Sequence, residues 1–264
     1  MTTLRELWER GGMTLGGWCT LPCSFSAEIM GYAGFDWICI DTQHGLIGYD
    51  CMVPMLQALS AARVPAFVRV SWNRPEEIMK ALDAGAQGVI VPMVNTAEEA
   101  ARAVQACRYP PLGERSWGPR RASLGVSGYT PEEGNRRTVL AVMIETRRAM
   151  ENLDAILSTP GIDAVYLGPS DLAVSHLMKP TGSPTEQAHI DLIEVVLDAC
   201  QRHGIVPGIH QDSVESAARW AERGFRMINV TSDSAFLAQT AGSVAGAMRE
   251  VAARYCKEQQ ALGI

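Results

Sequence analysis

Residues 66–92 read AFVRVSWNRPEEIMKALDAGAQGVIVP and contain one complete strand–helix–strand unit. The apolar runs Ala66–Val70 and Gly88–Pro92 predict buried strands. Between them, the amphipathic pattern of Pro75–Ala84 predicts a helix that ends at Gly85, where a glycine cap is expected. Because a helical crossover joins parallel strands, this unit predicts a parallel α/β fold.

The same unit recurs along the whole chain. Further strands are predicted at Leu15–Thr20, Trp37–Asp41, Val139–Glu145, Ala164–Gly168, Ile205–Ile209 and Met227–Thr231. Further helices are predicted at Ala27–Ala33, Met52–Ala62, Ala97–Arg108, Arg147–Leu157, Glu186–His203, Val214–Arg223 and Ala235–Glu258. Eight such units in 264 residues favour a closed barrel over an open sheet. We therefore expect one (β/α)8 TIM barrel domain that spans residues 1–264.

Composition narrows the class of protein. The net charge is −6, which argues against nucleic acid as the main partner. No apolar run approaches the roughly 20 residues of a membrane span, so we expect no membrane association. The N-terminal stretch MTTLRELWERGG is an amphipathic helical start without a cleavage site, so export is not expected. Seven cysteines, an odd number, indicate reduced thiols and a cytoplasmic location.

One predicted connection is unusually long. Residues 109–137 are rich in Gly and Pro and carry Arg115, Arg120 and Arg121. Loops of this length in compact domains are typically functional or mobile. This one follows the helix after the fourth strand and so begins at the floor of the barrel. It is either a solvated basic loop or a segment that climbs to the mouth or serves a neighbouring subunit.

Polar side chains gather where the predicted strands end. These ends read Asp41-Thr42-Gln43-His44, Arg69, Glu145 and Gly168-Pro169-Ser170-Asp171. In a parallel barrel the C-terminal ends of all strands open onto one mouth, where the active site lies. Two carboxylates, an arginine and a histidine are therefore expected to converge there. This set suits a divalent metal and a small oxo-acid.

Each of these residues also has a structural interpretation. Glu145 and Asp171 would hold a Mg²⁺ or Mn²⁺ ion together, or each would simply cap a helix. Arg69 would bind a carboxylate or enolate oxygen, or would only pair with Asp41. His44 would serve as an acid or base, or would be structural. The backbone N–H groups of Ser170 and Asp171 would hold a substrate carboxylate.

Several mechanisms are disfavoured by what the sequence lacks. The three lysines, Lys80, Lys179 and Lys257, are not at the ends of predicted strands, which disfavours an imine-forming mechanism. The last two strand–helix turns lack the glycine-rich character of a barrel phosphate site, so we expect a non-phosphorylated substrate. Neither GxGxxG nor GxxxxGK[ST] occurs, so there is no nucleotide-binding signature.

Several motifs resemble those of a known family. The run GFDWICIDTQH, the triplet VRV, and LDAGAQGVIVPMV, RYPPLGERSWG, VMIETRRAM and VYLGPSD occur in this order along nearly the whole chain. Together they resemble the metal-dependent class II pyruvate aldolases of the HpcH/HpaI family, which includes 4-hydroxy-2-oxoheptanedioate aldolases. The resemblance implies a TIM barrel whose C-terminal helix is exchanged between subunits, and a homo-oligomer built as a trimer of dimers.

The resemblance also assigns roles to residues. It implies that Glu145 and Asp171 bind Mg²⁺, Mn²⁺ or Co²⁺ and that pyruvate chelates this metal. Arg69 matches the arginine that stabilises the enolate, and His44 matches the histidine used in proton transfer. Asp83 matches an aspartate linked to that histidine, although our layout places it on the barrel floor. Further expected positions are Trp18, Gly168, Ser170 and Asp171 around the substrate, with Asp41 and Gln43 supporting them.

Two departures from the family pattern stand out. The family has Asp-Gly-Glu-His after the second strand, whereas this chain has Asp41-Thr42-Gln43-His44. Many members have glutamine where this chain has Met143, two residues before the metal glutamate. Both changes remove a charged or polar group near the expected pocket. They leave the metal and enolate residues intact, so they bear on the choice of aldehyde and donor rather than on the reaction class.

The sequence therefore predicts a lyase that reversibly cleaves a 4-hydroxy-2-oxo acid into pyruvate, or a related 2-oxo acid, and an aldehyde. One alternative is another enolate-forming lyase on the same site, such as an oxaloacetate decarboxylase or a hydroxyacyl-thioester lyase. The short chain offers no additional domain for a nucleotide handle, which disfavours the thioester. A second alternative is a non-catalytic barrel that binds oxo-acids.

Overall fold

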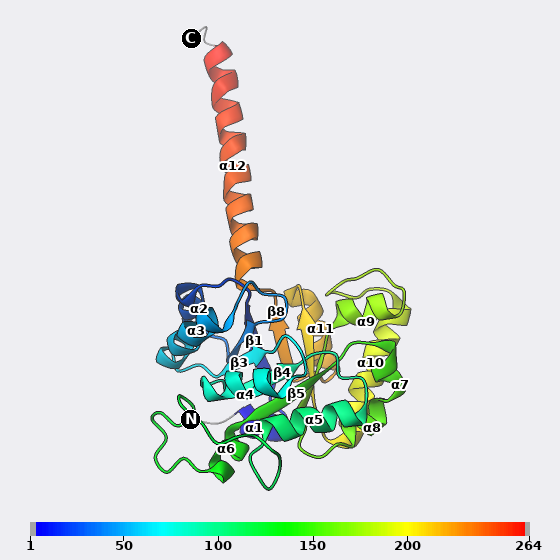
Figure 1. The fold of residues 1–264 in the computed structure, drawn as a ribbon. Helices are drawn as coiled ribbons and strands as arrows, with labels where there is room; N and C mark the ends of the chain where they lie inside the picture. Colours follow the sequence, from blue (N-terminus) through cyan, green and yellow to red (C-terminus); the bar gives the residue numbers. More distant parts are fainter. Residues whose placement is uncertain (1–3, 262–264) are drawn as a thin grey trace.

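A closed barrel of eight parallel strands forms the centre of the molecule (Figure 1). The computed structural model describes residues 4–261, with side chains to residue 257. The strands are β1 (Thr14–Cys19), β2 (Trp37–Asp41), β3 (Ala66–Arg69), β4 (Gly88–Val91), β5 (Val139–Ile144), β6 (Ala164–Leu167), β7 (Val206–Gln211) and β8 (Met227–Val230). Each strand pairs with its neighbours in sequence, and β1 pairs with β8 to close the ring. The prediction of a (β/α)8 TIM barrel is confirmed.

Helices surround the strands. They are α1 (Leu4–Glu9), α2 (Ser24–Tyr32), α3 (Tyr49–Ala61), α4 (Pro75–Asp83), α5 (Ala97–Cys107), α6 (Pro131–Arg137), α7 (Arg147–Glu151), α8 (Leu153–Leu157), α9 (Pro169–Ser175), α10 (Gln187–His203), α11 (Val214–Arg223) and α12 (Asp233–Ala261). The single helix predicted at Arg147–Leu157 is divided at Asn152, whose backbone leaves the helical region. Its side-chain amide donates to the carbonyls of Asn95 and Arg148, which holds the break in place.

Two apolar cores lie on opposite faces of the strands. Residues that point outward pack against the helices in one large cluster. Residues that point inward fill the barrel, among them Trp18, Trp37, Phe67 and Tyr166, all essentially buried. Successive side chains of a strand alternate between these faces. The barrel is therefore a packed core rather than a pore, and a site can form only towards its open end, where the strands finish.

The long connection between β4 and β5 is ordered by its own side chains. Trp117 packs between Tyr109 and Tyr129, with ring centroids 5.2 and 5.9 Å away. The guanidinium of Arg115 lies over the Tyr109 ring, 4.4 Å from its centroid. The last part of the segment forms α6, a helix that periodicity did not predict. In this chain the segment stays on the floor side, near α1 and α4, rather than climbing to the mouth (Figure 1).

The final helix behaves differently from the others. It begins at the mouth, directly after β8, and extends away from the barrel instead of returning along it (Figure 1). It packs on the barrel near its own start, beside β1. Along its length Leu237, Val244, Met248 and Tyr255 are exposed by 60 to 62%. Within residues 4–261 we find no helix that combines the length and apolarity needed to cross a membrane.

Candidate active site

A buried ion pair at the mouth joins β2 and β3. Asp41 and Arg69 are the last residues of these strands and lie side by side in the register of the sheet. Arg69 donates from Nε to Asp41 Oδ1 at 2.9 Å and from Nη2 to Oδ2 at 2.5 Å, a bidentate pair. The guanidinium also lies over Trp18, 5.0 Å from the ring centroid. Among the described residues Nη1 of Arg69 has no hydrogen-bond partner, so this group remains available to a ligand.

Asp41 organises more than the arginine. Trp18 Nε1 donates to its Oδ2 at 3.1 Å, and the backbone N–H groups of Gln43 and His44 donate to its Oδ1 at 3.0 and 3.2 Å. Burial by itself would raise the pKa of Asp41, but the hydrogen bonds and charge of Arg69 outweigh burial and hold it below its ordinary value. The carboxylate is therefore ionised and positions both the guanidinium and the turn that carries His44.

Glu145 is a buried carboxylate that forms no ion pair within the described residues. It directly follows β5 and is only 1% exposed. Its Oε1 accepts a hydrogen bond from the backbone N–H of Met93 at 2.7 Å. The pKa of Glu145 is raised to about 7: burial is the largest cause, the Met93 N–H lowers the pKa, the charge of Asp171 raises it and the charge of Arg69 lowers it. The two carboxylates are thus close enough to repel each other.

The other mouth residues surround this pair of carboxylates. Asp171 is exposed in the first turn of α9, after Gly168, Pro169 and Ser170. A Cβ atom at Gly168 would lie 2.8 Å from Oε2 of Glu145, so only glycine leaves this oxygen accessible. The structure brings Asp41, Arg69, Glu145, Asp171 and Trp18 to one mouth, as predicted, with His44 exposed on the turn above β2.

The donor set at the mouth fits a hard divalent cation. Glu145 Oε2 and the Asp171 carboxylate are both free of protein hydrogen-bond donors among the described residues. A cation between them would relieve the repulsion that contributes to the raised pKa of Glu145. No group of three or more His, Cys, Asp or Glu side chains converges in the described residues, at the mouth or elsewhere. Two carboxylates suffice for Mg²⁺ or Mn²⁺, which keep water and substrate oxygens as their other ligands.

Three polar side chains inside the barrel, those of Tyr166, Asn229 and His210, form a cluster that was not predicted from the sequence. Tyr166 donates its hydroxyl proton to Oδ1 of Asn229 at 2.5 Å, and His210 Nδ1 lies 3.5 Å from the same hydroxyl. The His210 ring meets the Trp18 ring edge-on, with centroids 5.0 Å apart. The predicted seventh strand stopped at Ile209, one residue short of His210. The two-residue alternation of β7, extended from Gly208, would have indicated that His210 points inward.

Asp83 does not join the mouth within one chain. It ends α4 at the opposite end of the barrel, where its Oδ1 accepts a hydrogen bond from Arg115 at 2.6 Å. The Arg115 side chain is almost fully buried there. The backbone N–H of Arg121 also donates to the Asp83 carbonyl. In this chain, therefore, Asp83 anchors the long floor segment, and its assignment to catalysis stays a prediction.

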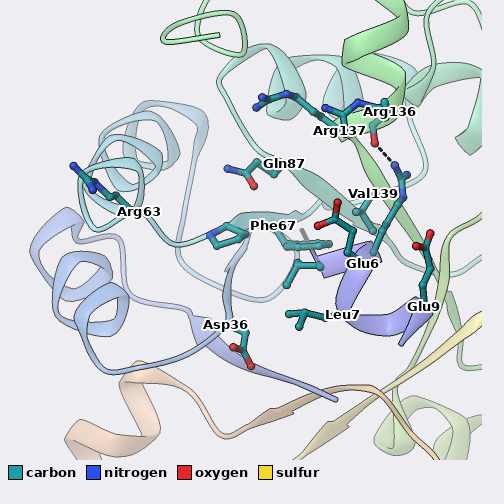
Figure 2. Close-up of a pocket in the computed structure, with 13 residues that line it drawn as sticks. Glu6, Leu7, Glu9, Asp36, Arg63, Phe67, Gln87, Arg136, Arg137 and Val139 are labelled. Atoms are coloured by element: carbon teal, nitrogen blue, oxygen red, sulfur yellow. Dashed lines mark hydrogen bonds between the residues drawn. The ribbon is translucent and has the colours of Figure 1, made fainter. Parts of the chain in front are cut away.

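The floor also holds a cavity of about 770 Å³ (Figure 2), and none of the mouth residues lines it. Phe67 and Val139 lie at the start of their strands and line it together with residues of α1. Arg136 and Arg137 lie at its rim (Figure 2) and both donate to the Glu133 carboxylate, at 2.7 and 2.5 Å. Because these guanidinium groups are already paired and no mouth residue lines the cavity, we do not place the chemistry there.

Comparisons with known proteins identify the family of this chain. The profile of the family described as HpcH/HpaI aldolase/citrate lyase matches residues 16–240. A hydroxypyruvate/pyruvate aldolase from Rhizorhabdus wittichii is 39% identical over 92% of this chain and 97% of that protein. A 4-hydroxy-2-oxo-heptane-1,7-dioate aldolase from Escherichia coli is 37% identical over 90% of this chain and 91% of that protein.

Solved structures show the same fold. The crystal structure of an HpcH/HpaI aldolase/citrate lyase family protein from Burkholderia cenocepacia has a TM-score of 0.87 and 29% identity to this chain. The alignment covers 94% of this chain and all of that one. The barrel, its carboxylate mouth and these relatives define a carbon–carbon lyase of the aldolase type. The chain belongs to the HpcH/HpaI aldolase/citrate lyase family, because the family profile and the relatives cover most of its length.

Proposed function

We propose that this protein reversibly cleaves a 4-hydroxy-2-oxo acid into pyruvate, or a closely related 2-oxo acid, and an aldehyde. One observation carries the proposal: a buried guanidinium, held rigidly by Asp41, faces the same mouth as the carboxylates of Glu145 and Asp171. The relatives named as aldolases support this reaction. The product of C3–C4 cleavage is an enolate, and a fixed positive charge favours its formation.

We propose Glu145 and Asp171 as the ligands of the divalent cation, Mg²⁺, Mn²⁺ or Co²⁺. When bound, the cation supplies Lewis-acid stabilisation of negative charge on the 2-oxo oxygen. The protein prepares the position in two ways. The Met93 N–H orients one oxygen of Glu145, and Gly168 keeps the other oxygen clear. The backbone of Ser170 and Asp171, in the first turn of α9, would present N–H groups to the substrate carboxylate.

The guanidinium of Arg69 supplies a positive charge that is already in position and does not have to move during the reaction. Two of its three nitrogens donate to Asp41, so its plane cannot rotate, and the third, Nη1, is free to donate to the developing enolate oxygen. Trp18 covers one face of the guanidinium and excludes water from it. The arginine therefore strengthens its hold on the substrate oxygen as negative charge develops there.

His44 is the proposed group for proton transfer with the 4-hydroxyl. Its side chain is exposed at the mouth, and its backbone is fixed through the hydrogen bond to Asp41. An imidazole can act as a general acid or base in proton transfer. Gln43 beside it has a buried Oε1 atom without a hydrogen-bond partner among the described residues, so it can accept a hydrogen bond from a ligand. Asp83 would act in catalysis only from a neighbouring subunit.

We further propose a homo-oligomer in which α12 packs on the barrel of a partner, as in the expected trimer of dimers. The stripe Leu237, Val244, Met248 and Tyr255 recurs at helical spacing and has no partner within the described chain. The barrel itself exposes Phe25, Ile29 and Tyr32 on α2, where apolar surface is available to such a helix. A cytoplasmic location is proposed from the free state of all seven cysteines.

Exchange of the pyruvate methyl protons with D₂O tests the proposed function without knowledge of the aldehyde. The rate is followed by NMR with Mn²⁺ or Mg²⁺ added, and again with EDTA. Metal-dependent exchange that EDTA abolishes, and that Glu145→Ala and Asp171→Ala each lose, is the expected result. Wild-type-like exchange in either variant would contradict the metal assignment. No exchange of pyruvate or hydroxypyruvate by the wild-type protein under any metal would contradict the proposed function.

A further inference from the structure

The interior of the barrel contains a chain of hydrogen bonds whose directions are determined. Asn229 donates from Nδ2 to the carbonyl of Thr231 at 3.3 Å, so its Oδ1 faces Tyr166. Tyr166 donates its only hydroxyl proton to that oxygen, at 2.5 Å. Towards His210, therefore, the Tyr166 oxygen has only lone pairs to offer. We take the 3.5 Å contact between this oxygen and His210 Nδ1 as a hydrogen bond, and Nδ1 is then its donor.

This direction determines the chemistry of the opposite ring nitrogen. Burial and the charge of Arg69 lower the pKa of His210 to about 4, so the imidazole is neutral at neutral pH. A neutral imidazole with its proton on Nδ1 carries a lone pair on Nε2. No side chain or backbone group among the described residues donates to this nitrogen. His210 therefore presents a hydrogen-bond acceptor, and not a donor, to any ligand near it.

The acceptor lies next to the proposed substrate position. The His210 ring is half-buried and contacts Trp18 edge-on. The same indole carries the guanidinium of Arg69 on its face, 5.0 Å from the ring centroid. Arg69 and His210 therefore share one tryptophan as their support. A 2-oxo acid bound by Arg69 and by the carboxylate pair would place its C3 substituent within the space lined by Trp18 and His210.

We propose that Nε2 of His210 accepts a hydrogen bond from a hydroxyl group on C3 of the donor, and so selects 3-hydroxylated 2-oxo acids, the class of hydroxypyruvate, over pyruvate. This inference rests on the proposed aldolase function and names its donor class. A methyl group at the same place would displace water from Nε2 and leave its lone pair without a donor, which costs affinity. Tyr166 is a positioning residue in this scheme, because its hydroxyl selects the tautomer.

Exchange of the C3 protons in D₂O tests the inference with pyruvate and hydroxypyruvate as probes, each corrected for the rate without enzyme. The measured quantity is the ratio of kcat/KM for hydroxypyruvate to that for pyruvate. The two donors differ in intrinsic acidity, but this difference cancels when variants are compared with the wild type. Loss of one neutral hydrogen bond predicts a ratio about tenfold lower in His210→Phe.

Further variants separate hydrogen bonding from packing. His210→Gln restores an acceptor oxygen and is expected to recover most of the ratio. Tyr166→Phe removes the hydroxyl that keeps the proton on Nδ1 of His210. It is therefore expected to lower the ratio severalfold. His203→Phe, a matched change at a half-buried histidine on α10 that pairs with Asp154, is expected to leave it unchanged. If His210→Phe does not fold, the other two variants still test the inference. The ratio is then expected to stay near the wild-type value in His210→Gln and to fall in Tyr166→Phe.

The possible failures are distinguishable. A ratio in His210→Phe, or in Tyr166→Phe, equal to that of the wild type overturns the role of His210 and leaves the aldolase function standing. A wild-type protein that exchanges neither donor with any metal overturns the proposed function, and the inference with it.

Discussion

The two buried acidic residues of the mouth are stabilised very differently. Asp41 is matched by the Arg69 guanidinium and by three further N–H donors, so its charge is well compensated. Among the described residues, Glu145 receives a hydrogen bond only from the Met93 N–H, and it lies near a second carboxylate, that of Asp171. Buried charges without compensation are costly. This difference supports our proposal that Asp41 is a supporting residue and Glu145 a ligand of the cation.

This imbalance predicts how the metal-free protein responds to pH. Glu145 has an ordinary pKa of 4.5 and one of about 7 in the fold, so between these values the folded state binds more protons than the unfolded state. Stability must therefore fall as pH rises from 4.5 to 7, by about 3 kcal/mol from this group. Glu145→Gln removes this fall. Urea unfolding of the metal-free proteins at pH 5 and pH 8 measures the difference.

Metal addition provides the control for this prediction. Mn²⁺ at pH 8 is expected to raise the free energy of unfolding of the wild type and to leave that of Glu145→Gln nearly unchanged. If both metal-free proteins lose equal stability between pH 5 and pH 8, the environment assigned to Glu145 is wrong.

We expect that lysine cannot replace Arg69 in catalysis, because an ammonium group lacks the forked geometry of a guanidinium. Lysine cannot make the bidentate pair with Asp41 and also direct a donor at the substrate. We expect Arg69→Lys to lower kcat/KM for donor proton exchange by about 100-fold. Arg202→Lys, at an exposed arginine on α10 paired with Asp154, is the control and should remain near the wild type. An Arg69→Lys activity within threefold of the wild type would remove Arg69 from catalysis.

At the scale of secondary structure elements, one aspartate holds three of them together. Asp233 begins α12 and is 6% exposed. Its carboxylate accepts hydrogen bonds from the backbone N–H and the hydroxyl of Thr20, after β1, at 2.8 and 3.0 Å. It also accepts a hydrogen bond from Ser26 Oγ of α2 at 2.8 Å. The start of the last helix is thus tied to the first strand–helix unit, which helps to close the barrel.

Removal of the Asp233 carboxylate is expected to lower the stability of the protein. Asp233→Ala leaves the Thr20 and Ser26 donors without their acceptor, so we expect the free energy of unfolding to fall by about 2 to 3 kcal/mol. Urea unfolding by circular dichroism gives this value. Asp198→Ala, at an exposed position on α10, should change it by no more than about 0.5 kcal/mol. Equal effects of the two substitutions would show that the Asp233 contacts contribute nothing.

The elements also show where local patterns succeed. The strands were found from short apolar runs because both of their faces are buried, one inside the barrel and one against helices. Glycines after helices were equally informative, since Gly85 and Gly204 have positive φ values of 103 and 65 degrees. Helix α6 was missed because its seven residues, PEEGNRR, carry no apolar stripe.

At the scale of the whole molecule, helix α12 carries an apolar surface that no other part of the described chain covers. Its stripe predicts self-association through a second copy. Val244→Asp with Met248→Asp puts two charges on this stripe and should lower the particle mass measured by light scattering. Arg249→Ala, on another face of the same helix, is the control. A mass unchanged by the double substitution would exclude this face from the interface, and circular dichroism verifies that the barrel remains folded.

The sequence by itself determined the barrel and most of its mouth. Strand ends are local features, and parallel closure brings all of them to one edge, so Asp41, Arg69, Glu145 and Asp171 were placed together before any coordinates. Only the tertiary structure decided the direction of α12, the pairing of Asp83 with Arg115, and the Tyr166–Asn229–His210 chain. These depend on contacts between distant segments, whose geometry follows from strand register and side-chain packing rather than from local sequence patterns.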